Sequence, residues 1–138
     1  MQYFDTDVLI HYLINQEPAK HQQAQELYRR AASSQTFFIS LLSLQELTYA
    51  LAKLPLKDIA AMDIAATVKN WHSPDLVNFN VEMFARALHL AQQIGFKNIN
   101  DCLHVALAEA HHCTELVTYN RKDFARLQPF TSLKINIL

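Results

Sequence analysis

The segment from Asn98 to Phe124 constrains the fold more than any other part of the chain. Asn100 is a good helix N-cap, and Asp101 then takes the first helical position, where the helix dipole favours a negative charge. Apolar residues recur behind it at helical spacing, and a short β-prone run, Leu116–Thr118, follows. The segment therefore predicts a carboxylate at a helix start and a buried strand that ends in a polar loop. In α/β proteins, binding and catalytic sites lie at such strand ends and helix starts.

The same alternation of short extended runs and helical stretches continues along the whole chain. The expected strands are Met1–Phe4, Thr36–Ile39, Leu76–Phe79, Leu116–Thr118 and Ser132–Leu138. The expected helices run from about Val8 to Ile14, Pro18–Ala32, Leu41–Leu54, Leu56–Trp71, Val81–Ile94 with Asn80 as its cap and Gly95 at its end, and onward from Asp101. No helix is placed between the last two strands. This order predicts a three-layer α/β/α fold with a mostly parallel central sheet, in one domain over residues 1–138.

Composition excludes several classes of protein. The single glycine, Gly95, argues against glycine-rich phosphate loops and a turn-rich all-β fold. The net charge of −1 leaves no general basic surface for nucleic acid, so such a role needs a local patch or a metal ion. No signal peptide or membrane span is expected. Cys102 and Cys113 fall about 16 Å apart on one expected helix, which excludes a disulfide between them and fits a reducing cytoplasm.

Four acidic residues fall where chemistry can use them. Asp5 ends the first strand, Glu46 lies inside the helix after the second strand, Asp101 starts a helix, and Asp123 follows the fourth strand. In a parallel sheet, strand ends and the following helix starts share one edge, so these carboxylates are expected to converge there. Each close pair repels by ~4 kcal/mol at an effective dielectric constant of 20. A cation that neutralises them is therefore expected, and oxygen ligands favour Mg²⁺ or Mn²⁺.

Simpler interpretations exist for some of these residues. Asp5 can cap the helix that follows it, Asp123 can cap a last short turn, and Asp101 can merely complement a helix dipole. Asp7 is expected to take the capping role beside Asp5 and is left out of the site. His104, one turn after Asp101, is interpreted as a packed or cleft-edge residue rather than as a metal ligand.

Four segments together resemble the PIN domain, and most closely its toxin group, the VapC-type ribonucleases of toxin–antitoxin pairs. The segments are Tyr3–Ile10 around Asp5, Ser43–Leu47 around Glu46, Asn100–Ala108 around Asp101, and Leu116–Phe124. They occur in the family's order and spacing, and the resemblance covers essentially the whole chain.

The resemblance implies an endoribonuclease that depends on Mg²⁺ or Mn²⁺. The family's first acid falls on Asp5, its helix glutamate on Glu46 and its third acid on Asp101. Its fourth position falls on Asn120 or Asp123, of which Asp123 is favoured as the acid and Asn120 as its polar neighbour. Asp5 and Asp101 are expected to hold the ion, with Glu46 and Asp123 binding a second ion or activating water.

The resemblance also implies supporting groups and partners. Thr6 and Thr118 fall on hydroxyl positions that orient carboxylates or water, and Arg121 and Lys122 are candidates for phosphate contacts. The expected partners are an RNA substrate, a cognate antitoxin and a second copy of the chain in a homodimer. Apolar residues on either side of Pro55 are candidates for those protein surfaces, with the core as their alternative place. The competing hypotheses are a housekeeping PIN nuclease in RNA processing and a catalytically silent PIN binding module.

Overall fold

A computed structural model describes residues 1–34, 37–53 and 77–138 of the chain. The strands are β1 (Gln2–Phe4), β2 (Phe37–Phe38), β3 (Glu115–Thr118) and β4 (Lys134–Ile137). The helices are α1 (Thr6–Leu13), α2 (Pro18–Ser34), α3 (Leu41–Lys53), α5 (Val81–Ile94), α6 (Ile99–Ala110) and α7 (Arg121–Leu127), with short 3₁₀ turns η1 (Phe96–Asn98) and η2 (Gln128–Phe130). The predicted helix Leu56–Trp71 lies outside the described residues. None of the described helices is both long and apolar enough to cross a membrane.

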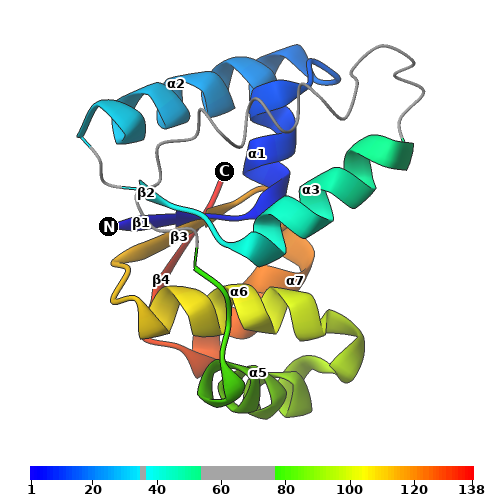
Figure 1. Cartoon of the computed structure of the whole chain (residues 1–138), viewed down its shortest axis with the longest axis vertical. Helices are drawn as coiled ribbons and strands as arrows, with labels where there is room; N and C mark the ends of the chain where they lie inside the picture. The colour runs from blue at the N-terminus through cyan, green and yellow to red at the C-terminus, as the bar shows by residue number, and fades with distance from the viewer. Residues whose placement is uncertain (35–36, 54–76) are drawn as a thin grey trace.

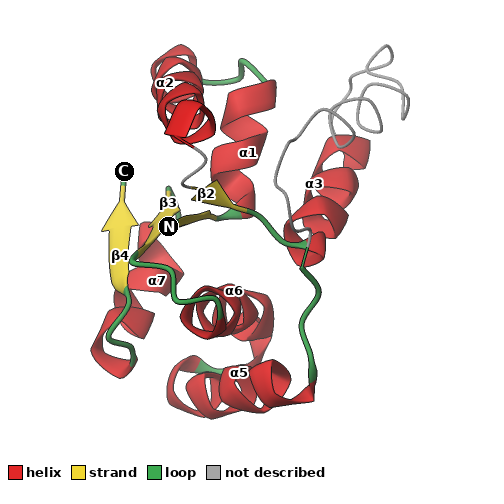
Figure 2. Cartoon of the chain, turned by 60° about the vertical axis from the view of Figure 1, so that its left-hand side comes forward, coloured by secondary structure: helices red, strands yellow, loops and turns green. Residues whose placement is uncertain are grey.

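The four strands form one parallel sheet in the order β2-β1-β3-β4, which confirms the predicted sheet (Figure 2). The strand predicted over residues 76–79 is wrong where the structure describes it, because Val77 makes only an isolated bridge with Ser40. The side chain of Asn78 accepts a hydrogen bond from the backbone N–H of Phe79 at 2.9 Å. Such local bonds compete with a strand ladder and explain why pairing stops there.

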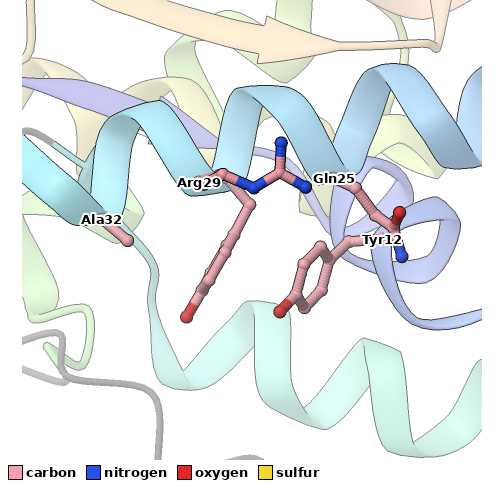
Figure 3. Close-up of a pocket in the computed structure, with 5 residues that line it drawn as sticks. Tyr12, Gln25, Arg29 and Ala32 are labelled. Atoms are coloured by element: carbon pink, nitrogen blue, oxygen red, sulfur yellow. The ribbon is translucent and has the colours of Figure 1, made fainter.

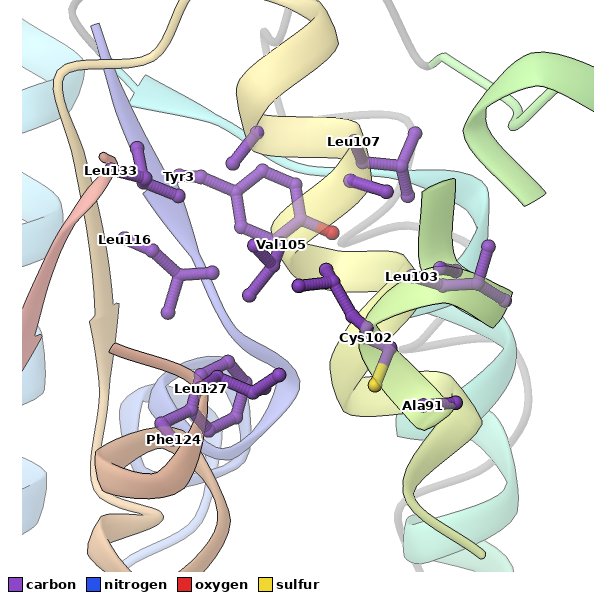
Figure 4. Packing of buried hydrophobic residues seen from close by; sticks show 14 of the residues in the cluster. Tyr3, Ala91, Cys102, Leu103, Val105, Leu107, Leu116, Phe124, Leu127 and Leu133 are labelled. Atoms are coloured by element: carbon purple, nitrogen blue, oxygen red, sulfur yellow. The ribbon is translucent and has the colours of Figure 1, made fainter. Parts of the chain in front are cut away.

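Helices cover both faces of the sheet, so the predicted three-layer α/β/α fold is confirmed (Figure 1). Tyr3 packs with α5, α6 and α7 on one face, whereas its neighbour Phe4 packs with α1, α2 and α3 on the other. This division follows from the strand geometry, in which successive side chains point to opposite faces. Figure 4 shows the first cluster, where Leu107 of α6 and Phe124 of α7 meet Tyr3 and Leu116. Each such buried side chain contributes about 1.5–3 kcal/mol.

The ends of α5 agree with the sequence, but the start of α6 does not. The side chain of Asn80 accepts from the N–H of Met83 at 2.9 Å, and Gly95 ends α5 at φ 110°, a conformation that favours glycine. Helix α6 begins at Ile99, so the prediction that Asn100 is its N-cap is wrong. The turn η1 leads directly into α6, which leaves the side chain of Asn100 free for a contact described below.

The sequence predicted no helix between the last two strands, but the structure has α7 there. Strands β3 and β4 are parallel, so the chain has to cross back between them, and α7 with η2 makes that crossover. The side chain of Asn120 caps α7 by accepting from the N–H of Asp123 at 3.2 Å. The carboxyl ends of β1 and β3 thus lead directly into α1 and α7 at one edge of the sheet.

Candidate active site

Asp5 and Thr118 end neighbouring strands and touch at the edge of the sheet. Asp5 caps α1, because its Oδ1 accepts from the backbone N–H of Thr6 at 2.7 Å. Its Oδ2 accepts from the hydroxyl of Thr118 at 2.7 Å. Both Asp5 and Thr118 are buried. The parallel topology therefore fixes one carboxylate in place through two hydrogen bonds.

Glu46 joins this edge from the middle of α3. Its Oε2 accepts from the hydroxyl of Thr6 at 2.6 Å, and its Oε1 accepts from the side-chain amide of Asn100 at 2.7 Å. Glu46 thereby connects α3 to the first turns of both α1 and α6. The side chain of Asn100 serves this contact instead of capping α6.

His104 lies between the carboxylates. It is 1% exposed, as a packed residue should be, yet its Nε2 lies 2.8 Å from Glu46 Oε2 and 3.5 Å from Asp5 Oδ1. Its Nδ1 lies 2.7 Å from the hydroxyl of Tyr3. That hydroxyl also meets the hydroxyls of Ser40 at 2.8 Å and Ser43 at 3.2 Å. His104 is therefore held from both sides of its ring.

The charges of this group are interdependent. Burial lowers the pKa of His104, but Tyr3, Asp5 and Glu46 outweigh burial and raise that pKa well above its ordinary value. Burial raises the pKa of Glu46, but hydrogen bonds from His104, Thr6 and Asn100 outweigh it, and the net pKa is lowered. His104 is thus the cationic partner of an anionic Glu46. The pKa of Asp5 is raised, chiefly by burial, against the opposing effect of His104.

Asp101 lies in the first turn of α6, as predicted, although not at its first position. Its Oδ2 accepts from the side-chain amide of Asn98 at 3.4 Å, which is a weak contact. Burial and then the charge of Asp5 raise the pKa of Asp101 to about 6. The charged form of this carboxylate is therefore disfavoured by desolvation and by repulsion from Asp5, and no cationic side chain among the described residues forms an ion pair with it.

Asp7 belongs to this edge as well, and its expected capping role is wrong because Asp5 caps α1. Its Oδ2 accepts from the N–H of Tyr119 at 2.9 Å and from the hydroxyl of Thr118 at 3.1 Å. Its Oδ1 is buried and meets no hydrogen-bond partner within the described ranges. Burial and then Asp5 raise the pKa of Asp7 to about 7.

The start of α7 borders the site. The side-chain amide of Asn120 donates to Asp123 Oδ2 at 3.2 Å, and Arg126 lies 3.6 Å from Asp123 Oδ1. Asp123 also contributes to the raised pKa of Asp101, so the two carboxylates are electrostatic neighbours. Arg121 and Lys122 are exposed on the first turn of α7.

A cleft of about 370 Å³ brings most of these groups to solvent. It is lined by Asp5, Thr6, Asp7, Ile10, Glu46, Tyr49, Ala50, Asn100, Asp101 and Asn120. Asp123 is not among the lining residues, whereas Asn120 is.

The donor set of this cleft fits a divalent cation. Asp5, Glu46 and His104 each offer one ligand atom, and these atoms lie within 4.8 Å of one another. The partnerless Oδ1 of Asp7 and the raised pKa of Asp101 show carboxylates that lack a counter-charge. Carboxylate oxygens suit Mg²⁺ and Mn²⁺. His104 can be a ligand only as the neutral imidazole, and in its protonated form it donates to Glu46 instead.

A second hollow, of about 340 Å³, lies between α1 and α2 (Figure 3). Tyr12, Gln25, Tyr28, Arg29 and Ala32 line it, and the rings of Tyr12 and Tyr28 stack at 4.2 Å. It has no carboxylate among these lining residues, so the acidic cleft is the candidate active site.

The fold and the cleft together define an α/β/α protein whose acidic groups gather at the carboxyl edge of a parallel sheet. The family model of the PIN domain matches residues 3–128. The chain therefore belongs to the PIN domain family, as its four segments predicted.

Solved structures share this fold over nearly the whole chain. FitAcB from Neisseria gonorrhoeae is 14% identical with a TM-score of 0.65, over 99% of this chain and 96% of that chain. VapBC2 from Rickettsia felis, bound to a DNA fragment from its promoter, is 22% identical with a TM-score of 0.67, over 100% and 99%. FitAB bound to the IR36 DNA fragment is 14% identical with a TM-score of 0.70, over 98% and 93%. Among curated proteins, none matches the sequence.

Two further residues belong to the site although the sequence did not place them there: Asp7, which lines the cleft, and His104, which contacts two of the lining carboxylates. His104 was visible as a histidine one turn behind Asp101, which is the spacing that puts two side chains on one helix face. Asp7 was visible two residues after Asp5, but its partner, the N–H of Tyr119, lies 112 residues away. No local signal in the sequence reports that contact.

Proposed function

We propose that this protein is an endoribonuclease that hydrolyses RNA phosphodiester bonds with Mg²⁺ or Mn²⁺. The observation that carries the proposal is the meeting of Asp5, Glu46 and Asp101, from three separate elements, in one cleft. Membership of the PIN domain family supports a nuclease. The residues that would hold the ion are Asp5, Glu46 and Asp101, with Asp123 as the fourth acid beside Asn120.

The bound ion would supply positive charge to the phosphate in the transition state and make a water molecule more acidic. The residues of the chain prepare the cleft for that chemistry. Thr118 and the N–H of Thr6 orient Asp5, and the Thr6 hydroxyl with Asn100 orients Glu46. Arg121 and Lys122, exposed beside the cleft, are positioned to meet phosphates of the RNA.

We further propose that the protein is the toxin of a toxin–antitoxin pair, acts in the cytoplasm and forms a homodimer. The similarity in fold to VapBC2 and to the FitAB complexes over almost their entire length supports an antitoxin partner. The free, buried thiols of Cys102 and Cys113 are consistent with a reducing compartment. We propose that residues 1–138 form a single PIN domain, since β4, beyond residue 128, completes the same sheet. Of the apolar residues on either side of Pro55 that are candidates for such surfaces, Leu51 is buried in the core, whereas Leu54, Leu56 and Ile59 lie outside the described residues.

The test is cleavage of a mixed RNA pool by the purified chain with Mg²⁺, with Mn²⁺ or with EDTA. We expect cleavage with either ion, none with EDTA, and none by Asp5→Asn. Glu82→Gln is the matched control, because Glu82 is an exposed acid of α5 away from the cleft. A fully active Asp5→Asn protein would contradict the assignment of the site. Failure to cut RNA with any ion would instead favour the silent binding module.

A further inference from the structure

A groove of about 560 Å³ continues the acidic cleft along α3. It is lined by Gln45, Glu46, Thr48, Tyr49, Ala52 and Asn100. Glu46, Tyr49 and Asn100 line both hollows, so a ligand that passes the carboxylates enters this groove next. Its volume falls in the range of small-molecule sites.

Tyr49 is the prominent feature of the groove. It is 65% exposed, the most exposed aromatic side chain within the described ranges. It lies three residues after Glu46 on α3, so both side chains share one helix face. An aromatic ring that covers no core and stands beside an acidic cleft is available to a ligand.

Lys53 lies one turn further along the same face. Its Nζ is 4.1 Å from the centroid of the Tyr49 ring. The rise from Glu46 to Lys53 is about 10 Å, close to three stacked nucleotides at about 3.4 Å each. An exposed cation–π contact is weaker than the stacking of a base on an aromatic ring. A base can therefore take the place of the ammonium group, which is then free to meet a phosphate.

We propose that this groove is a nucleobase subsite, in which a base of single-stranded RNA next to the cleaved phosphate stacks on Tyr49. The amides of Gln45 and Asn100 lie where they can meet the edge of that base, and Lys53 meets the backbone. The inference rests on the proposed function, which makes RNA the polymer in the cleft. A nucleotide fits better than an apolar peptide segment, because the lining combines one ring with two amides and opens onto the acidic groups. The ammonium group of Lys53 lies over that ring and adds a positive charge beside the groove.

The test measures binding rather than cleavage, in an Asp101→Asn background that keeps the RNA intact. The probes are short single-stranded RNAs that each carry the fluorescent base 2-aminopurine at a different position. We expect quenching at one main position, where the base stacks. Tyr49→Ala should abolish that quenching and weaken RNA binding by about 5- to 140-fold, the range that loss of one stacked base gives. Tyr49→Phe should retain both, because it keeps the ring.

The control is Phe130→Ala, which removes an exposed aromatic ring of η2 outside the groove and should leave binding unchanged. Thermal unfolding should be the same for Tyr49→Ala and its parent. Equal RNA binding with and without Tyr49, or an equal loss in Phe130→Ala, would overturn the subsite. So would a Tyr49→Ala effect confined to the complex with an antitoxin, which would assign the groove to protein binding.

The same variants separate this inference from the nuclease itself. Tyr49-dependent RNA binding by a chain that never cuts RNA would support the subsite and contradict the nuclease. Cleavage whose KM and kcat are both insensitive to Tyr49→Ala would support the nuclease and overturn the subsite.

Discussion

Glu46 Oε2 and His104 Nε2 lie 2.8 Å apart, although 58 residues separate them in the sequence. Glu46 comes from α3 on one face of the sheet and His104 from α6 on the other, so their contact joins the two outer layers beneath the cleft that Glu46 lines. Nδ1 of the same ring lies 2.7 Å from the hydroxyl of Tyr3, so the ring is held between Glu46 on one side and Tyr3 on the other. The orientation of Glu46 therefore depends on a residue of β1 that does not line the cleft.

Tyr3→Phe tests this dependence, since it removes the hydroxyl that meets His104, Ser40 and Ser43 and leaves the buried ring in place. The free energy of unfolding should fall by about 1–3 kcal/mol, because buried polar groups around the hydroxyl lose a hydrogen-bond partner. The kcat for RNA cleavage should fall by about 10- to 100-fold with little change in KM, the usual effect of removing a group that orients a ligand residue. Urea unfolding and steady-state cleavage measure the two quantities.

Tyr12→Phe is the matched control, because Tyr12 lines the hollow between α1 and α2 and not the acidic cleft. Its kcat should stay at the parent value. If Tyr3→Phe were destabilised but kept the parent kcat, the contact would serve folding alone.

Thr118→Val removes a second orienting group while keeping the shape of a buried side chain. The hydroxyl of Thr118 lies 2.7 Å from Asp5 Oδ2 and 3.1 Å from Asp7 Oδ2, so the two carboxylates share its one proton and both are affected by its loss. Mn²⁺ affinity should fall by about 10- to 100-fold. Isothermal titration calorimetry measures it, and Thr131→Val is the control, since Thr131 donates to Glu109 instead. Unchanged Mn²⁺ binding by Thr118→Val would show that Asp5 does not need this hydroxyl.

The sequence was sufficient to predict that Asp5, Glu46 and Asp101 meet. Asp5 follows a strand, Asp101 lies in the first turn of a helix, and a parallel sheet brings such positions to one edge whatever the details of packing. The spacing of apolar residues likewise predicted helices α2, α3 and α5 with bounds that agree with the structure to within two residues. The helices follow from local sequence patterns, and the meeting of the carboxylates follows from the rule that strand ends and helix starts share one edge of a parallel sheet.

The contacts that complete the cleft depend instead on how elements pack. The link from His104 to Tyr3 spans 101 residues and requires that α6 sit over β1 in one register. Helix α7 is seven residues long, and its short run offers little periodicity, so it was missed. Asp5 caps α1, and Asp7 instead accepts from the backbone N–H of Tyr119, a contact 112 residues away in the sequence that local patterns do not report.

Asp101→Asn should separate stability from activity. The substitution removes a half-buried charge whose pKa is raised to about 6 by desolvation and by Asp5, so it should increase thermal stability in EDTA at pH 7.5. Cleavage should fall at least about 100-fold, because an ion that stabilises the transition state by several kcal/mol loses a ligand. Differential scanning calorimetry and RNA cleavage are the measurements, with Glu82→Gln as an exposed control. A variant that is both less stable in EDTA and fully active would contradict both parts.

Stability in EDTA should fall as the pH rises from about 4 to about 7. Asp7 and Asp101 have an ordinary pKa of 3.8, and the fold raises these values to about 7 and about 6. Between those limits the folded chain binds more protons than the unfolded chain, so raising the pH favours unfolding. Each pKa unit is worth about 1.4 kcal/mol, and partial exposure reduces that effect, so the expected fall is about 2–4 kcal/mol.

Urea unfolding at a series of pH values measures this slope. Asp7→Asn should flatten the slope more than Asp101→Asn does, because the pKa of Asp7 is raised further than that of Asp101. The Asp7→Asn protein then keeps only the titration of Asp101 near pH 6. The slope should reverse in excess Mn²⁺, because ions bind the deprotonated carboxylates and stabilise the folded chain more as the pH rises. A stability in EDTA that increased from pH 4 to 7 would show that these carboxylates are neither buried nor crowded in solution.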